Sequence, residues 1–162
     1  MYISRIFRSL NVSMQEQFMH EVLALNEKTK HYGLTLTPQD VERMLAARSQ
    51  VLHSYGRVEL GTQATKELIE RFSSSAFIEQ ENYADTLNEL QEIFYYLKNE
   101  TEDQISDVEL LNRMKDMFEE HCEGSLELLK SKLEAYAEDY RRELQRNESM
   151  LEGEDDHWNL RI

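Results

Sequence analysis

Residues 83–97, Tyr83-Ala-Asp-Thr-Leu-Asn-Glu-Leu-Gln-Glu-Ile-Phe-Tyr-Tyr-Leu97, decide the fold class. Their apolar side chains recur at alternating steps of four and three residues, at Tyr83, Leu87, Leu90, Phe94 and Leu97. This spacing places all five on one face of a helix and is typical of a seam between packed helices. The stretch therefore predicts a core helix over about residues 80–99.

Two further helices are predicted on the C-terminal side of this stretch. Ser106, followed three residues later by Glu109, is a capping box that opens a helix with Leu110, Leu111, Met114 and Phe118 facing inward. After Gly124-Ser125, a last helix over about residues 126–147 carries one apolar stripe of Leu126, Leu129, Leu133, Tyr136, Tyr140 and Leu144. We expect Phe94 and Leu133 to be buried in the core.

Three helices are predicted on the N-terminal side. The first, about 14–31, follows a capping box at Ser13 and Glu16 and ends at Gly33. The second begins at Thr37-Pro38, because proline lacks a donor that the first helical turn would leave unbonded, and continues to Gly56. The third runs from Thr62 to about Phe72. Between them, residues 56–61 alternate apolar with charged side chains and predict an extended connector or a single β-bridge.

The whole chain is therefore predicted to be all-α, with one domain of about six helices over residues 1–147. The last three helices are expected to form an antiparallel bundle core against which the first three pack. Residues 148–162 form an acidic tail without an apparent helical period. Its apolar residues, Trp158, Leu160 and Ile162, are expected to dock on the domain or on a partner.

Composition excludes several classes of function. The 162 residues carry a formal net charge of −14, and a surface of that sign repels nucleic-acid phosphate and anionic lipid. Cys122 is the only cysteine, so no disulfide forms within the chain. The N-terminus does not have the pattern of a signal peptide, and no apolar run reaches the roughly 18 residues that a membrane span needs. We expect a cytoplasmic protein that binds neither nucleic acid nor membrane.

One segment suggests metal chemistry. Residues 98–109 resemble a calcium-binding EF-hand loop, with candidate ligands at Glu100, Glu102, Ser106 and Glu109. However, Lys98 stands at the first ligand position, and Asp103 replaces the glycine of the sharp turn. The competing interpretation is a solvated acidic turn whose Ser106 caps the next helix. No other pattern predicts a metal, a phosphate loop or a nucleophile beside a base, so no cofactor and no catalytic residue are expected.

Several short strings together resemble a known family: Leu36-Thr-Pro-Gln-Asp40, Gly56-Arg-Val-Glu-Leu-Gly61, Gln80-Glu-Asn-Tyr83, Phe94-Tyr-Tyr-Leu-Lys-Asn-Glu100 and Cys122-Glu-Gly-Ser-Leu-Glu127. The chain resembles, over about residues 34–135, an uncharacterised family of small acidic bacterial proteins, a domain of unknown function. The resemblance implies a bacterial cytosolic protein and assigns no activity to any residue.

Elimination leaves a non-catalytic protein-interaction or adaptor protein, with a protein partner or self-association, as the expected function. Two alternatives stay open. One is a helical protein that responds to a divalent cation through Glu100, Glu102, Ser106 and Glu109. The other is an enzyme whose site is assembled from distant helices and is not visible in the spacing of the sequence.

Overall fold

The structure is a computed structural model that describes the backbone of residues 2–159 and the side chains of residues 12–152. Its helices are α1 (Tyr2–Ala24), α2 (Asn26–Thr29), α3 (Pro38–Ser54), α4 (Gln63–Phe72), α5 (Tyr83–Glu100), α6 (Asp107–Asp116) and α7 (Leu126–Asn159). A short 3₁₀ turn, Lys30–Tyr32, follows α2, and a π-helical turn, Met117–His121, follows α6. Residues 2–159 contain no strand, and setting aside the four-residue α2 they form six α-helices, so the predicted all-α fold is confirmed.

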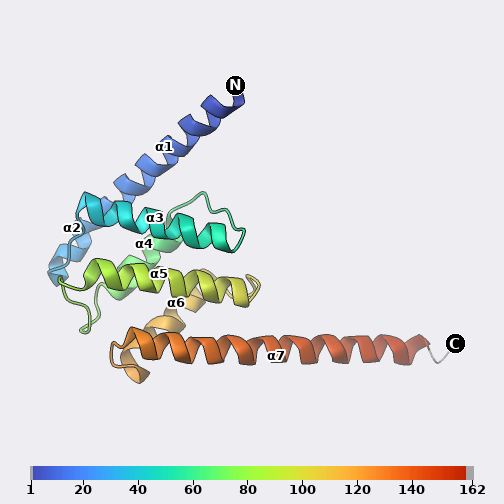
Figure 1. Cartoon of the computed structure of the whole chain (residues 1–162). Coiled ribbons are helices and arrows are strands. Elements are labelled where there is room, and N and C mark those ends of the chain that lie inside the picture. Colours follow the sequence, from blue (N-terminus) through green and yellow to red (C-terminus); the bar gives the residue numbers. More distant parts are fainter. Residues whose placement is uncertain (1, 160–162) are drawn as a thin grey trace.

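The helices form two layers with α5 at the centre (Figure 1). Helices α3, α5 and α7 lie side by side and run in the same direction, while α4 and α6 return behind them. Consecutive helices from α3 to α7 therefore alternate in direction. Helix α1 packs on α3 and α4. The C-terminal half of α7 extends away from the other helices.

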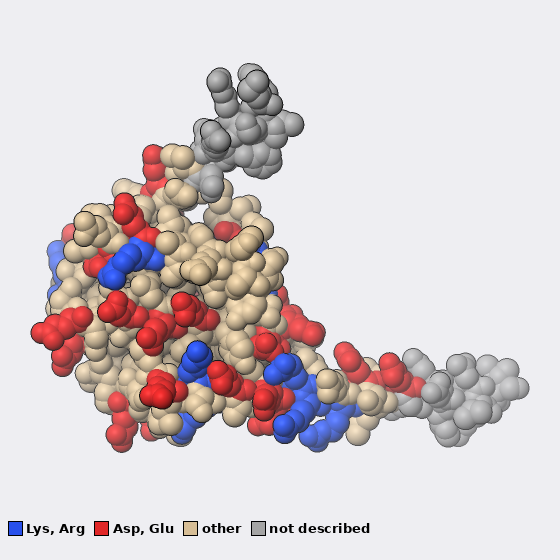
Figure 2. Space-filling model, viewed as in Figure 1, with Lys and Arg blue, Asp and Glu red and all other residues tan. Residues whose placement is uncertain are grey.

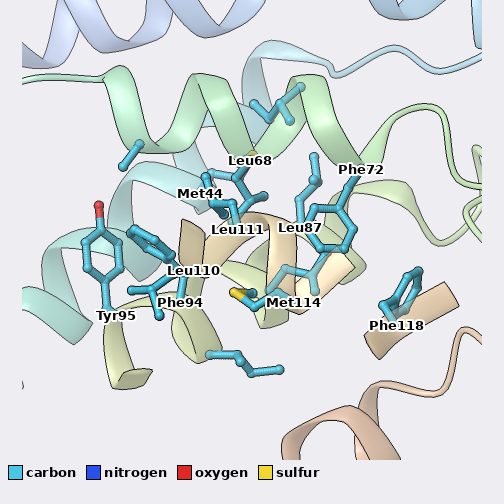
Figure 3. Packing of buried hydrophobic residues seen from close by; sticks show 14 of the residues in the cluster. Met44, Leu68, Phe72, Leu87, Phe94, Tyr95, Leu110, Leu111, Met114 and Phe118 are labelled. Atoms are coloured by element: carbon cyan, nitrogen blue, oxygen red, sulfur yellow. The ribbon is translucent and has the colours of Figure 1, made fainter. Parts of the chain in front are cut away.

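The core follows the predicted seam. Every one of the five seam residues of α5 is at most 1% exposed, and so are the four inward residues of α6 and its π turn, Leu110, Leu111, Met114 and Phe118. Figure 3 shows six of them, Leu87, Phe94, Leu110, Leu111, Met114 and Phe118, in one cluster with Met44 of α3 and with Leu68 and Phe72 of α4. The rings of Phe72 and Phe118 pack edge to face with their centroids 5.6 Å apart. Each large apolar side chain buried in this way contributes about 1.5–3 kcal/mol.

Two predicted helix boundaries are confirmed in atomic detail. Thr37 and Asp40 form a capping box at the start of α3, in which each side chain accepts a hydrogen bond from the other residue's backbone N–H. Ser106 accepts a hydrogen bond from the backbone N–H of Glu109 at 3.2 Å and caps α6. The starts of both helices are therefore set by hydrogen bonds between residues three apart, which is why a short stretch of sequence predicts them.

The first helix starts earlier than predicted. Helix α1 begins at Tyr2, and both Ser13 and Glu16 lie inside it as exposed residues, so the predicted capping box at residue 13 is wrong. The reason is that Ile3, Phe7, Leu10 and Met14 continue the same spacing of three and four residues upstream of Ser13. No proline or glycine interrupts the chain before Gly33, which ends the 3₁₀ turn at a φ of 75°.

The last helix ends later than predicted. Helix α7 continues past residue 147 to Asn159, so most of the tail that was expected to lack a helical period is helical. Residues 143–152 are rich in Glu, Leu, Gln, Arg and Met, which have high intrinsic helix propensity. Propensity therefore carries the helix beyond the point where its apolar stripe weakens. Residues 57–61 are neither helix nor strand, in agreement with the predicted connector.

Candidate functional site

A groove of about 570 Å³ lies between α3, α5 and α7, on the face where these three helices run side by side. Its floor is apolar and comes from all three helices: Val51 from α3, Ile93 from α5, and Leu126 and Leu133 from α7. Ile93 and Leu133 are buried, whereas Val51 and Leu126 are half-buried. The apolar floor is therefore continuous with the core, and Val51 and Leu126 are the floor residues that solvent reaches.

The rim of the groove is acidic. Glu89 and Glu92 stand on α5, Glu127 and Glu134 stand on α7, and Lys130 is the only basic residue that lines the groove. Figure 2 shows Asp and Glu side chains gathered over this face of the molecule. Among the described residues, no Lys or Arg nitrogen comes within 4.0 Å of any of these four carboxylates. The groove therefore holds negative charge that the described residues do not pair.

Two tyrosines complete the lining, Tyr55 at the end of α3 and Tyr96 on α5. Burial raises the pKa of the Tyr55 phenol, and the nearby carboxylates of Glu100 and Glu92 raise it further. Burial likewise raises the pKa of Tyr96, with Glu100 and Glu134 adding to the effect. Both hydroxyls are therefore protonated donors at neutral pH, and both rings lie in a negative field.

The apolar floor, acidic rim and two tyrosines together favour one class of ligand. An apolar floor accepts the methylene stem of a lysine or arginine side chain, while the rim carboxylates and the electron-rich faces of tyrosine rings attract its cationic end. A carboxylate or phosphate would meet like charge on the rim. The groove thus favours cationic groups that carry an aliphatic part.

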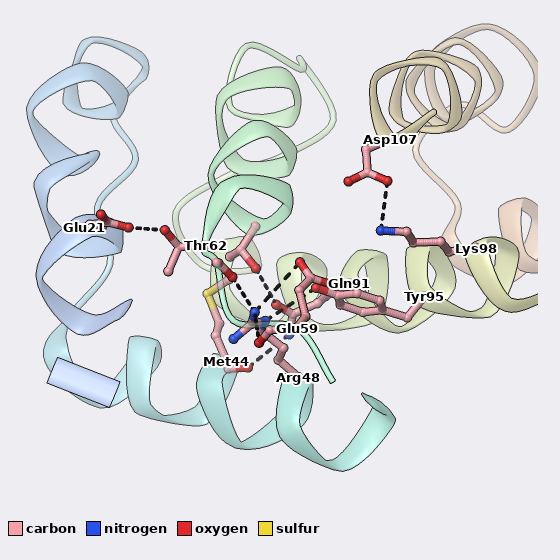
Figure 4. Close-up of polar contacts among 11 residues, drawn as sticks. Glu21, Met44, Arg48, Glu59, Thr62, Gln91, Tyr95, Lys98 and Asp107 are labelled. Carbon is pink, nitrogen blue, oxygen red and sulfur yellow. Dashed lines mark hydrogen bonds and ion pairs between the residues drawn. The ribbon is translucent and has the colours of Figure 1, made fainter. Parts of the chain in front are cut away.

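The connection between α5 and α6, predicted as a candidate metal site, has several of its charges paired within the protein. Glu100 forms an ion pair with Arg141 of α7 at 3.0 Å, and Lys98 pairs with Asp107 at 3.0 Å, as Figure 4 shows for the second pair. Asp103 pairs with Arg57. Each of these side chains therefore forms an ion pair with a residue of opposite charge in the same chain.

The four predicted ligands are not brought together. The Ser106 hydroxyl is engaged as the cap of α6, and the side chains of Glu102 and Glu109 are exposed. Within the described residues, no three His, Cys, Asp or Glu side chains are placed so that they could hold a metal ion. Glu100, Glu102 and Glu109 therefore do not form such a group, and Glu100 pairs with Arg141 of α7.

Other residues considered from the sequence lie apart from the groove. Cys122 is 3% exposed and packs in the core, whereas its neighbour His121 is exposed. Trp158 lies within the bounds of α7, but its side chain lies outside the described residues, as do Leu160 and Ile162. The expected docking of these three residues therefore stays a prediction. In the part of the chain that the structure describes, no helix is both long and apolar enough to cross a bilayer.

Sequence reasoning missed the groove because its lining comes from three separate stretches, residues 51–55, 89–96 and 126–134. A partial signal was present. Glu89 and Glu92, one helical turn apart, share a face of α5 with Tyr96, and Glu127, Lys130 and Glu134 follow the same spacing on α7. Each pattern alone is typical of a solvated helix face, and only the packing of α5 beside α7 combines them.

Comparison with known proteins assigns the chain to a family. No curated protein and no solved structure matches the chain. A family model described as a family of unknown function (DUF6323) matches residues 21–146, a span that contains every residue of the groove. Because this match covers most of the 162 residues, the chain belongs to the DUF6323 family of unknown function.

Proposed function

We propose that the protein is a non-catalytic interaction protein whose groove between α3, α5 and α7 binds a Lys- or Arg-bearing segment of a partner protein. The observation that carries this proposal is the combination of four unpaired rim carboxylates with an apolar floor. A basic side chain would place its stem on the half-buried Val51 and Leu126 and its charge between the glutamates. The partner would then supply the cations that the described residues do not.

The expected binding is weak and depends on salt. An exposed ion pair contributes about 0.2–1 kcal/mol, so several must act together with burial of the aliphatic stems. A partner with alternating basic and apolar residues matches both the rim and the floor. The same charge argument supports a protein partner over nucleic acid or an anionic membrane surface, since both of those are polyanions.

One feature of the groove supports an interaction role over catalysis. The groove is lined by carboxylates, two phenols and one ammonium group, without His, Cys or Ser.

The acidic composition and the single cysteine suit a cytoplasmic protein, which is the location we propose, and the bacterial origin implied by the resemblance fits the same assignment.

The test uses a fluorescein-labelled decapeptide of alternating Lys and Leu, with the Glu/Leu version of the same peptide as the negative probe. Fluorescence anisotropy should show saturable binding of the basic peptide only. Replacing both groove residues, Glu89→Gln with Glu92→Gln, should weaken binding by about two- to thirtyfold, because two ion pairs are lost.

A matched control removes the same charge elsewhere. Glu79→Gln with Glu81→Gln changes two exposed glutamates just before α5 that do not line the groove, and this variant should bind nearly as well as the original protein. If both pairs of substitutions weaken binding equally, the peptide is responding to total charge and the groove is not the site. Absence of saturable binding would also overturn the proposal.

A further inference from the structure

The C-terminal half of α7 is a helix without cover from the rest of the described chain. At 1.5 Å per residue its 34 residues span about 51 Å, yet among its side chains described, up to residue 152, the last buried one is Ala137. Tyr140 and Leu144 are half-buried, and every residue from 145 to 152 is exposed. Figure 1 shows this part leaving the body of the protein.

The uncovered part continues the apolar seam of α7. Ala137, Leu144 and Leu151 are spaced seven residues apart, and Tyr140 and Asn147 lie on the same face between them. Leu151 is nevertheless 62% exposed. A helical segment of this length is marginal in water without packing, so an unpaired seam of this kind favours a second helix against it.

The charges of the C-terminal half of α7 indicate that the second helix is another copy of the same segment. Residues 141–146 carry three arginines and one glutamate, whereas residues 147–156 carry five acidic residues and no basic one. Two copies of this segment placed antiparallel bring the basic block of each copy beside the acidic block of the other. Two antiparallel copies of this segment are therefore complementary in charge.

The positions of the charges agree with this orientation. Arg141 is engaged by Glu100 of its own chain, which leaves the exposed Arg142 and Arg146 to face a second helix. In an antiparallel pair centred near Asn147, Arg146 of one copy lies level with Glu148 of the other, and Arg142 lies level with Glu152. A parallel pair would instead place Glu143 of one copy beside Glu148 of the other, where like charges repel.

We propose that residues 140–154 of α7 are a self-association surface, on which two copies of the chain pair antiparallel about a centre near Asn147. Leu144 and Leu151 supply the apolar contact, and the basic and acidic blocks set the direction. This surface is separate from the groove, so either proposal can fail without the other.

Sedimentation velocity over a concentration series tests the association. The full chain should form a dimer that weakens at high salt. Leu151→Asp should raise the dissociation constant more than about tenfold, because it places a charge in the apolar seam. The control, Ser149→Asp, adds the same charge on the face that points away from the seam and should change the dissociation constant much less. A monomer at every concentration, or equal effects of the two variants, would overturn the proposal.

Disulfide trapping tests the direction. Asn147→Cys lies near the centre of the antiparallel pair, so mild oxidation should link the two copies. Glu154→Cys should not link, since its two copies would lie about 20 Å apart along the helices at 1.5 Å per residue. Linking of both variants would indicate a parallel pair and reject the antiparallel arrangement. Failure of Asn147→Cys to link in a sample that sediments as a dimer would place the interface elsewhere.

Discussion

The guanidinium of Arg48 in α3 donates a hydrogen bond to the backbone carbonyl of Glu59 at 3.1 Å and so fastens the irregular connector to a helix. The same Nη2 donates to the carbonyl of Gly61, and Nε donates to the Tyr95 hydroxyl at 3.4 Å (Figure 4). The Glu59 carboxylate lies 3.8 Å away and completes an ion pair. Arg48 is only 7% exposed, so it satisfies polar groups that water reaches poorly.

Replacing this arginine should destabilise the fold. Arg48→Met keeps much of the volume but leaves two carbonyls and Glu59 without their donor, and we expect a loss of about 2–3 kcal/mol in the free energy of unfolding. Urea denaturation followed by circular dichroism measures it. The control is Arg43→Met in the same helix, whose exposed pairs with Asp40 and Asp85 should contribute less than about 1 kcal/mol. Equal losses for the two variants would show that Arg48 does not fasten the connector.

The α5 seam makes a second prediction. Phe94 is 1% exposed, and Phe94→Ala should lower the free energy of unfolding by about 3–5 kcal/mol because it leaves a cavity in the core. Val58 is 87% exposed in the connector, and Val58→Ala should change stability by less than about 0.5 kcal/mol. Thermal and urea unfolding of both variants check the contrast. A small effect at Phe94 would place the core elsewhere than at the α5 seam.

The extent to which sequence predicts this molecule depends on how local each signal is. The α5 seam and the Thr37 and Ser106 caps lie within single helices, and the structure confirms all three. The predicted helix start at Ser13 was wrong because a Ser and a Glu three residues apart also occur inside helices. The apolar residues before Ser13 show that the helix is already under way there. The groove was not predictable because its floor and rim require α3, α5 and α7 to meet, and that contact is set by long-range packing.

The turn before α7 requires a glycine. Gly124 has a φ of 81°, and a Cβ added there would lie 2.5 Å from the Cβ of Phe77. Gly124→Ala should therefore lower the free energy of unfolding by about 1–3 kcal/mol through both the backbone conformation and the overlap. Gly61→Ala is the control, since a Cβ at Gly61 meets nothing within 4 Å. Adding Phe77→Gly, which removes the Cβ of residue 77 as well as its ring, should relieve part of the Gly124→Ala effect, and a strictly additive double variant would argue against the overlap.

Asp103 makes stability depend on pH in the acid range. The hydrogen bond from Arg57 holds the pKa of this carboxyl below its usual value, and the charges of Arg57 and Lys98 act in the same direction. Because the folded pKa is lower than the unfolded one, the contribution is complete above the unfolded pKa, near 3.9, and is lost as pH falls through the folded pKa. Asp103→Asn should therefore destabilise the protein at pH 7 and have little effect near pH 2.

Thermal unfolding of both proteins between pH 2 and 7 tests this dependence. Asparagine tolerates the left-handed conformation at this position, where φ is 58°, so the substitution removes the charge without adding backbone strain. Asp116→Asn removes an exposed carboxylate that has no ion pair among the described residues, and its pH profile should follow that of the original protein. A difference between Asp103→Asn and the original protein that stayed constant from pH 7 to pH 2 would show that the effect is not the charge of Asp103, because a protonated carboxyl at low pH should resemble the amide.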